Sequence, residues 1–171
     1  RDRIKRNHAP GGMMSYESAD DLKFYVKKGY CPGNAGKTLE WAFQDWGLSR
    51  MALRMGKKSD AALYEKRSRA WTPLFNKNIG LILPKKENGE WLHTDPLNGQ
   101  GWVEANAWQA TWSVSHDLPK LVELMGGGDA FCEKLNYAFE QARPTDFVHA
   151  YSGGYVSYAC LLYTSDAADE E

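Results

Sequence analysis

The chain has 171 residues, of which 43% are hydrophobic and 25% are charged, and its net charge at pH 7 is −1. This balance is typical of one globular domain or part of one. It speaks against a nucleic-acid-binding surface, which needs a basic stripe, and the sequence has no apolar run long enough to span a membrane.

The first residues indicate an internal piece of a longer protein. Residue 1 is Arg rather than Met, and no signal-peptide pattern follows it. Beyond a glycine-rich loop at 10–12, Ser18 and the acidic residues after it predict the start of a helix. We expect this helix to run to about Lys28, where Gly29 ends it.

A long helix is predicted at 38–55, because apolar residues recur there at three- and four-residue spacing. Gly56 follows the helix and ends it. Ser59 and Asp60 then predict the capped start of another helix, which we expect to reach about Phe75. The apolar positions of the long helix are Leu39, Ala42, Phe43, Trp46 and Leu53.

The helical pattern breaks between residues 76 and 101. Asn88 and Gly89 favour a tight turn between two extended runs, 80–83 and 90–93. We therefore expect a short β-hairpin within this long loop.

Helices are predicted again near residue 104, near 115–117 with Pro119 in the first turn, and from Gly128 to Ala142. Helix pairs joined by long loops favour a helical array or toroid, in which the loops gather at one end and carry function. The expected fold class is therefore mainly α, with a short β-hairpin in a long loop.

The segment 101–112 carries the clearest chemical pattern. It reads Gly-Trp-Val-Glu-Ala-Asn-Ala-Trp-Gln-Ala-Thr-Trp, with a single carboxylate, Glu104, among aromatic and amide side chains. Indole faces stack on the C–H face of a pyranose, and amides exchange hydrogen bonds with hydroxyl groups. Aromatic neighbours that partly desolvate a carboxylic acid raise its pKa, as a general acid at neutral pH requires. The pattern is glycosidase-like, with half of a catalytic pair visible.

A structural interpretation of the same segment needs no chemistry. Trp108 and Trp112, four apart on a helix, would be core residues, and Glu104 would be a residue of the surface or the first turn. Asn106 and Trp108 could line a sugar site or could pack the start of the helix. We take Glu104 as the candidate catalytic acid, and Trp108 and Asn106 as candidate substrate-binding residues.

Other polar residues predict no metal site. His93 and His116 do not have the spacing of a ligand pair. His116 with Asp117 at a helix start is more typical of local capping than of a catalytic dyad. The oxygen-rich loop at 95–100 lacks a defined ligand spacing, and we interpret it as a turn that leads to Glu104.

Three segments follow one another in a recognisable order. Residues 29–42 form a Gly-rich turn and a helix start, residues 104–109 read Glu-Ala-Asn-Ala-Trp-Gln, and residues 121–127 read Leu-Val-Glu-Leu-Met-Gly-Gly. Together they resemble glycoside hydrolase family 92, a family of calcium-dependent, inverting exo-α-mannosidases. The family has Gly more often than Ala at position 105, a departure that leaves the acid, the amide and the indole in place.

The resemblance implies that residues 1–159 are an internal fragment of a catalytic (α/α)6 toroid, whose other helices come from sequence not present here. It implies that Glu104 is the general acid, which protonates the departing glycosidic oxygen. An inverting mechanism also needs a second carboxylate, roughly 6.5–9.5 Å away, to activate water. In the family this base, and a substrate motif of the type Gly-His-Gly-Asn-Glu-Pro, lie downstream, and neither occurs before Ala159.

The resemblance further implies a calcium cofactor whose ligands lie outside this fragment, a mannose-containing glycan as partner, and a secreted or periplasmic parent protein. We predict that the fragment alone does not turn over substrate, and its oligomeric state stays open. Two other classes remain: a non-catalytic helical sugar-binding or interaction module, and an unrelated (α/α)6 glycosidase or lyase.

Residues 160–171 are expected to be foreign to the fold. The stretch from Cys160 to Glu170 back-translates to the end of a transposon-type sequencing-library adapter, so we expect the biological sequence to stop near Ala159. Polar and acidic residues dominate this tail and predict disorder. Without it two cysteines remain, Cys31 and Cys132, which we expect to be free, mostly buried thiols.

Overall fold

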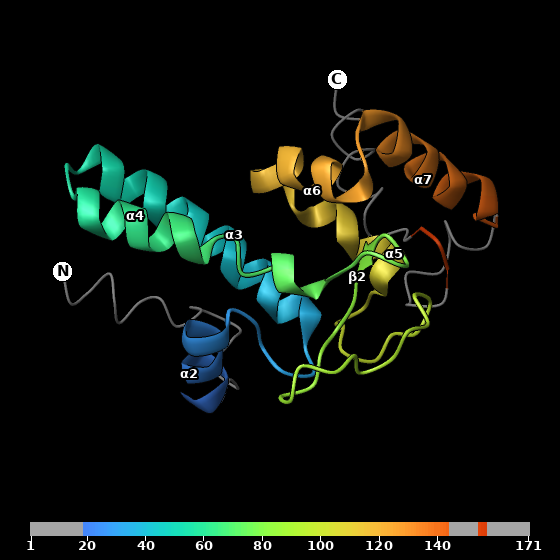
Figure 1. Cartoon of the computed structure of the whole chain (residues 1–171), viewed down its shortest axis with the longest axis horizontal. Helices are drawn as coiled ribbons and strands as arrows, with labels where there is room; N and C mark the ends of the chain where they lie inside the picture. The colour runs from blue at the N-terminus through green and yellow to red at the C-terminus, as the bar shows by residue number, and fades with distance from the viewer. Residues whose placement is uncertain (1–18, 144–153, 157–171) are drawn as a thin grey trace, which may run out of the picture.

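A computed structural model of the chain describes residues 19–143 and 154–156, which are coloured in Figure 1. The described residues are mostly helical, with a small two-stranded antiparallel sheet, which confirms the predicted mainly α fold with a short hairpin. The predicted cap at Ser18 and the predicted tail at 160–171 lie outside the described residues. The α-helices are α2 (Ala19–Lys28), α3 (Ala35–Arg54), α4 (Lys58–Arg67), α5 (Ala107–Ala110), α6 (Leu118–Met125) and α7 (Gly128–Gln141); 3₁₀ helices span Thr72–Leu74, Thr111–Ser113 and Ser115–Asp117; the strands are β1 (Phe75–Asn76) and β2 (Leu81–Ile82).

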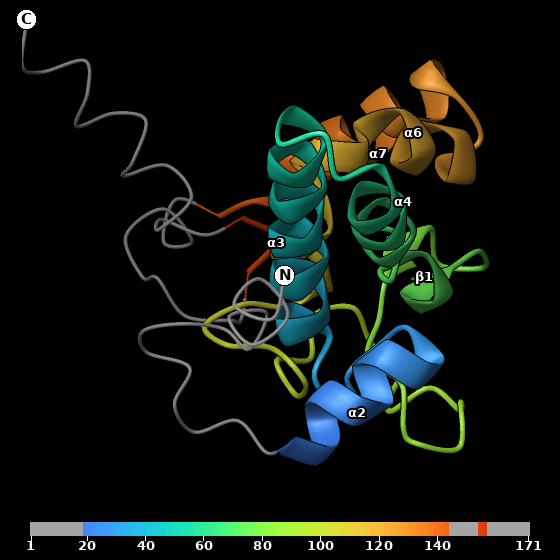
Figure 2. The same cartoon turned by 90° about the vertical axis from the view of Figure 1, so that its left-hand side faces the viewer.

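Helices α3 and α4 form an antiparallel pair and lie side by side in both views (Figures 1 and 2). The first of them begins at Ala35 rather than at the predicted Thr38. It does so because Asn34 caps it, with Oδ1 accepting a hydrogen bond from the Lys37 N–H at 2.8 Å. Gly56, with φ of +70°, turns the chain into α4.

The buried face of α3 differs from the predicted apolar stripe. Leu39 and Ala42 are buried as expected, whereas Phe43 and Leu53 are 47% and 53% exposed. The stripe is wrong at these positions because α4 packs on a face of α3 that contains polar side chains. The buried polar residues of α3 are Thr38, Asp45 and Ser49.

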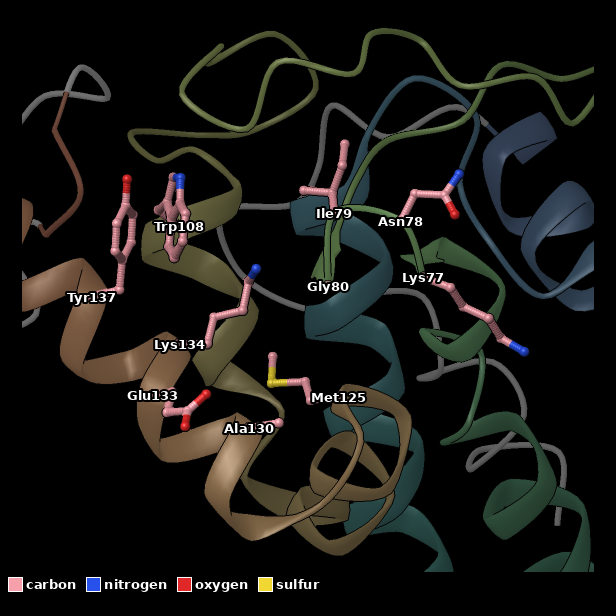
Figure 3. A pocket seen from close by; sticks show the side chains of 10 residues that line it. All are labelled: Lys77, Asn78, Ile79, Gly80, Trp108, Met125, Ala130, Glu133, Lys134 and Tyr137. Atoms are coloured by element: carbon pink, nitrogen blue, oxygen red, sulfur yellow. The ribbon is translucent and has the colours of Figure 1, made fainter.

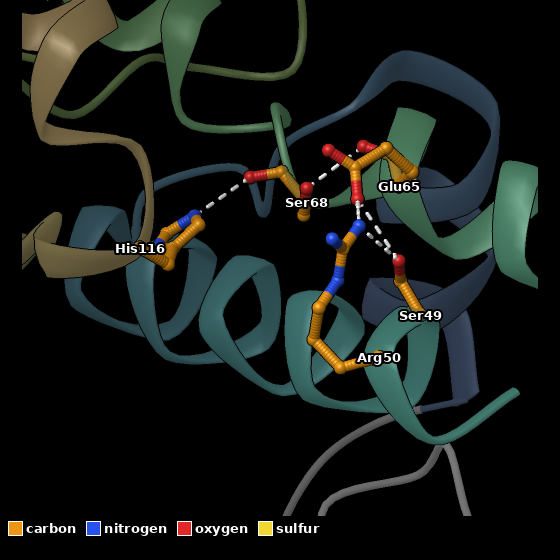
Figure 4. A network of polar contacts seen from close by, with 5 residues as sticks. All are labelled: Ser49, Arg50, Glu65, Ser68 and His116. Atoms are coloured by element: carbon orange, nitrogen blue, oxygen red, sulfur yellow. Dashed lines mark hydrogen bonds and ion pairs between the residues drawn. The ribbon is translucent and has the colours of Figure 1, made fainter. Parts of the chain in front are cut away.

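A polar network joins α3, α4 and the turn before α6 (Figure 4). The Glu65 carboxylate accepts hydrogen bonds from Ser49 Oγ at 2.9 Å and from the Arg50 guanidinium. Ser68 Oγ donates to the Glu65 carbonyl oxygen at 2.7 Å. The Ser68 carbonyl oxygen in turn accepts from His116 Nε2 at 2.9 Å, so that nitrogen carries the proton. These bonds take the place of apolar contacts between the helices.

Asp45 is fully buried and joins residues of α2, α3 and α4. Its Oδ2 accepts a hydrogen bond from the Tyr25 hydroxyl at 3.0 Å and lies 3.4 Å from Arg67 Nε. Burial raises the pKa of Asp45 to about 7, and burial together with the nearby Asp45 raises the pKa of Tyr25. The sequence did not predict this cluster, because an acidic residue such as Asp45 within a helical pattern is normally read as exposed.

Helix α4 is shorter than predicted and starts differently. Its N-cap is Lys57, whose side chain makes no capping hydrogen bond, and Ser59 and Asp60 lie inside the first turn. The helix ends at Arg67, and the chain continues through a 3₁₀ turn that contains Pro73. Proline has no N–H to donate and clashes with a preceding helical turn, so α4 cannot extend through this segment.

The two-stranded sheet pairs different residues from those predicted. β1 and β2 are antiparallel, with Phe75 opposite Ile82 and Asn76 opposite Leu81. The residues of β2 are completely buried. The predicted run at 80–83 is therefore a core strand that pairs with the residues before it, not with 90–93.

The predicted turn at 88–89 does form, and its second arm lies within the predicted run 90–93, but its first arm is 84–86 rather than 80–83. The Lys86 N–H donates to the Glu90 carbonyl oxygen at 2.8 Å, and the Leu92 N–H donates to the Pro84 carbonyl oxygen at 2.9 Å. This second hairpin extends into solvent beside the core.

Helices α6 and α7 form a second pair, on the opposite side of the molecule from the end of α3 (Figure 1). Pro119 lies in the first turn of α6, as predicted. Gly126 and Gly127, with φ of +104° and +109°, turn the chain into α7. That helix ends at Gln141, one residue before the predicted end.

The core lies among α2, the start of α3, the β1–β2 sheet and α5. Cys31 is buried there, but Cys132 is exposed on α7, so the expected burial is wrong for the second of these free thiols. Within the described residues, no helix combines the length and the apolar character needed to cross a membrane. The large side chains with the least exposure are Trp41, Trp71, Tyr25, Tyr64, Leu74, Leu81, Ile82, Leu83 and Leu121.

Candidate active site

Glu104 lies at a bend just before α5, and its side chain is exposed. Its backbone φ of +51° falls in the left-handed region, which side-chain-bearing residues seldom adopt. Among the described residues it is the one non-glycine residue with a positive φ. Such strain costs about 1–3 kcal/mol and clusters at functional sites. The backbone therefore singles out Glu104 independently of the sequence pattern.

The tryptophans near Glu104 do not bury it. Trp102 is 9% exposed, and its ring lies beside Gly36 of α3. Trp108 is 7% exposed and packs toward α7. The expected desolvation of Glu104 by these neighbours is therefore wrong for the described residues, because both indoles pack away into the core.

The loop that leads to Glu104 is held against the Gly-rich turn before α3. The Gly101 carbonyl oxygen accepts a hydrogen bond from the Ala35 N–H at 2.8 Å, at the first turn of α3. Gly101 has φ of +86°, and a Cβ there would stand 2.7 Å from Pro84 Cβ. The Gly33 N–H donates to the Lys85 carbonyl oxygen at 2.7 Å. The Gly-rich turn, the second hairpin and the loop that carries the carboxylate are thus held together.

The oxygen-rich loop before the bend is a series of turns. Asp95 Oδ1 accepts from the Leu97 N–H at 3.0 Å, and Asn98 Oδ1 accepts from the Gln100 N–H at 2.8 Å. The His93 ring nitrogen Nε2 donates to the Gln100 carbonyl oxygen at 2.8 Å. The interpretation of this loop as a turn is confirmed.

The described residues do not fit a calcium ion. They contain no group of three or more His, Cys, Asp or Glu side chains that could hold a metal. In the loop before the bend, Asp95 Oδ1 and Asn98 Oδ1 already accept backbone hydrogen bonds. A hard cation that takes six or more oxygen ligands would need donors from elsewhere.

Asn106 caps α5 and is completely buried. Its Oδ1 accepts from the Gln109 N–H at 3.1 Å, and its Nδ2 donates to the Gly154 carbonyl oxygen at 2.8 Å. Gln109 Nε2 donates to the same carbonyl at 3.0 Å and to that of Val156 at 3.3 Å. Two amides of the motif therefore clamp a distant segment. Sequence reasoning missed this role, because the partner lies 45–48 residues downstream.

Trp108 belongs to a cluster of aromatic rings. Its ring centroid lies 5.5 Å from that of Tyr137 on α7 and 5.2 Å from that of Tyr155. Lys134 Nζ stands 5.3 Å from the same indole centroid. Both candidate substrate-binding residues are thus engaged with protein groups here, and their contact with substrate stays a prediction.

His116 and Asp117 make long-range bonds in place of the predicted local cap. Asp117 is the N-cap residue of α6, yet its side chain makes no capping hydrogen bond. Its Oδ2 accepts from Trp71 Nε1 at 3.3 Å, while His116 bonds to the Ser68 carbonyl oxygen. Both side chains attach the start of α6 to the turn after α4.

Comparisons with known proteins agree on one family. The model of the glycosyl hydrolase family 92 catalytic domain matches residues 3–159. An uncharacterized secreted glycosidase of Arthroderma benhamiae is 26% identical over 157 residues, a match covering 74% of this chain and 20% of that protein.

Solved structures give the same result. An inverting mannosidase of family GH92 from Bacteroides thetaiotaomicron VPI-5482 is 29% identical, with a TM-score of 0.69 over 77% of this chain and 19% of that one. An α-mannosidase of the same family from Bacteroides thetaiotaomicron is 23% identical, with a TM-score of 0.72 over 84% of this chain and 19% of its own, a likeness that shows the fold. A second structure of that enzyme contains mannoimidazole. The chain spans about a fifth of the length of these relatives.

Proposed function

Because the chain belongs to glycosyl hydrolase family 92, we propose that its parent protein is an exo-acting α-mannosidase, which releases terminal α-linked mannose from glycans. The inverting mannosidase and the mannoimidazole-bound α-mannosidase support the choice of mannose and of inversion. The proposal concerns the parent protein, because the chain is a fragment of the family's (α/α)6 catalytic domain.

The observation that carries the proposal is the position of Glu104. Its exposed carboxylate stands on a strained bend, braced from below by the Gly-rich turn before α3. Exposure leaves the carboxylate accessible to a ligand, and the bracing holds the backbone segment that leads to Glu104. Preorganised side chains of this kind are what an acid catalyst needs.

In this mechanism Glu104 donates its proton to the glycosidic oxygen as the bond to the anomeric carbon breaks. A second carboxylate, outside residues 1–159, accepts a proton from the water that attacks the opposite face of the sugar. The two carboxyl groups would stand roughly 6.5–9.5 Å apart, which leaves room for that water. The isolated chain lacks the base and should not turn over substrate.

Trp108 and Asn106 remain our proposed substrate-binding residues. Since both are buried, we expect them to form the wall behind Glu104 rather than an open stacking face. We also propose calcium for the parent protein, with ligands from residues that the structure does not describe. A secreted or periplasmic location is supported by the relative named as a secreted glycosidase.

The first test is a Glu104→Gln substitution in the full-length protein. With an unactivated α-mannobiose substrate, kcat should fall by about 10²–10⁴-fold, the usual contribution of a general acid. With a dinitrophenyl α-mannoside the loss should be much smaller, because that leaving group departs without a proton. Glu87→Gln, an exposed carboxylate on the second hairpin, is the matched control and should leave both rates unchanged.

Two further readouts separate the alternatives. Inversion is checked by proton NMR of the first product formed, which should be β-mannose, and calcium dependence by chelation and calcium restoration. If the Glu104→Gln substitution lowered kcat by the same factor on both substrates, or did not lower it, the role of Glu104 would be refuted. A full-length protein that binds mannosides without hydrolysing them would instead favour a sugar-binding module, and hydrolysis by the 171-residue chain would refute its inactivity.

A further inference from the structure

A cavity of about 500 Å³ opens between the turn at 77–80, α5 and α7 (Figure 3). Its volume is in the range of about 300–1,000 Å³ that small-molecule sites occupy. Glu104 is not among the described residues that line it. The cavity therefore shares Trp108 with the candidate active site but leaves the candidate acid outside it.

One wall of the cavity is aromatic. Tyr137 and Trp108 stand next to each other, with ring centroids 5.5 Å apart and planes tilted by 34° (Figure 3). Tyr137 is 44% exposed, whereas Trp108 is nearly buried and also contacts Tyr155. Tyr137 also contacts Tyr155, with ring centroids 5.9 Å apart, so these two neighbours hold its ring in place while part of it stays exposed. Such a face suits the C–H side of a pyranose ring.

Polar groups surround this wall. The Lys134 side chain passes between Gly80, where a Cβ would stand 3.2 Å from Nζ, and the indole of Trp108. Among the residues that the structure describes, no carboxylate forms an ion pair with Lys134. Its ammonium group therefore retains donors for a ligand's hydroxyl groups. Glu133 and Asn78 add acceptors at the rim.

We propose that this cavity is an accessory saccharide-binding site for a neutral hexose unit, with Tyr137 as the stacking residue and Lys134 as the hydrogen-bond donor. A neutral sugar fits better than an anion, because both Lys134 and Glu133 line the cavity. The site rests on the proposed function only for the choice of mannose as the sugar.

The test is a titration of the 171-residue chain with α-1,2-linked mannobiose, followed through the amide NMR signals of Gly80, Lys134 and Tyr137. These signals should shift and saturate together. Tyr137→Ala should weaken binding by about three- to tenfold, the effect of losing one aromatic contact. Phe139→Ala is the matched control, since Phe139 is exposed on the same helix but does not line the cavity.

Circular dichroism of each variant checks that the fold is retained, and Lys134→Met supplies a second substitution should Tyr137→Ala fail to fold. Equal affinities for the unchanged chain and a folded Tyr137→Ala variant would overturn the proposal. The proposal would also be overturned if the 171-residue chain bound mannobiose and the full-length protein did not, because other parts of the parent would then fill the cavity.

The outcome is independent of catalysis. A full-length protein with no mannosidase activity but with Tyr137-dependent binding would refute the proposed function and support the accessory site. A full-length protein with mannosidase activity but without Tyr137-dependent binding would support the proposed function and refute the accessory site.

Discussion

Single backbone positions set the geometry of the candidate acid. Gly101 lies against Pro84 with a positive φ and accepts a hydrogen bond from the start of α3, and Glu104 follows in a left-handed conformation. Glycine adopts such angles without a steric penalty, whereas a side chain does not. The course of the backbone that leads to Glu104 therefore depends on a residue that has no functional group of its own.

Gly101→Ala should lower the free energy of unfolding by about 2–4 kcal/mol, because the new Cβ would overlap Pro84 in a backbone conformation that alanine resists. Urea denaturation followed by tryptophan fluorescence measures the change. Gly47→Ala is the control, because a Cβ added to this exposed helical glycine would meet no neighbouring side chain within 4 Å. The Gly47→Ala substitution should raise the free energy of unfolding by about 0.5–1 kcal/mol. Equal effects at both positions would contradict the packing argument.

At this scale the sequence indicated a candidate acid, whose role stays a prediction, but not its conformation. Glu104 was identifiable because a lone carboxylate among indoles and amides is chemically distinctive. The strain at Glu104 and the burial of Asn106 were not predictable, because both depend on contacts with segments far along the chain. Local patterns carry no information on such partners.

Helices α3 and α4 are held together by polar groups as well as by apolar packing. Asp45 is the extreme case, a fully buried carboxylate between Tyr25 and Arg67. Removing a charge from water is costly even when a partner is present, which is why the folded state favours the protonated acid. The helix pair should therefore respond to pH in a way that an apolar interface would not.

The pH dependence has a definite sign. The pKa of Asp45 is about 7 in the folded chain, above its ordinary value of 3.8, so the folded state binds more protons between these values. The stability that protonation of Asp45 contributes is complete below about pH 4 and is lost as the pH rises to about 7. The free energy of unfolding falls over this range by at most about 1.4 kcal/mol per pH unit.

Asp45→Asn should remove that slope, although it also lowers stability at every pH by leaving Arg67 without its partner. Urea denaturation at intervals between pH 4 and pH 8 compares the slopes. Asp129→Asn, at an exposed position of α7, should keep the slope of the unchanged chain. An unchanged slope in Asp45→Asn would show that another group is responsible.

Element types were easier to predict than their boundaries and pairings. Helices α3 and α7 carry strong periodicity and punctuating glycines, so their existence followed from the sequence. The strand at 81–82 was assigned the wrong partner, because a short apolar run indicates burial without indicating which neighbour it pairs with. The predicted start of α4 was wrong for a similar reason, since the two good capping residues stand two and three residues beyond the observed N-cap, Lys57.

At the scale of the molecule, the described residues expose several apolar side chains along one helix. Phe43, Met51 and Met55 lie at four- or eight-residue spacing on α3 and just beyond its end, and all are exposed. A helix face of this kind normally packs on a neighbour. The chain spans about a fifth of the length of its relatives, and we infer that other parts of the parent protein pack on this face.

The 171-residue chain should therefore self-associate, whereas the full-length protein should not do so through this face. Sedimentation velocity over a tenfold range of concentration would show a rising average mass for the chain. A Phe43→Glu and Met51→Lys double variant should reduce the association, while Val26→Lys, at an exposed position of α2, should not. A chain that stays monomeric throughout would contradict this explanation of the exposed face.

The clamp between the amides of α5 and Gly154 has a consequence for the order of events during synthesis. The intervening helices α6 and α7 contact each other at short sequence separation and can pair early, but the clamp must wait for Val156. At about 5–20 residues per second, the chain emerges from Glu104 to Val156 in about 3–10 s. Throughout that interval the bend with the candidate acid lacks its final support, so the residue most closely tied to chemistry is among the last to reach its native setting.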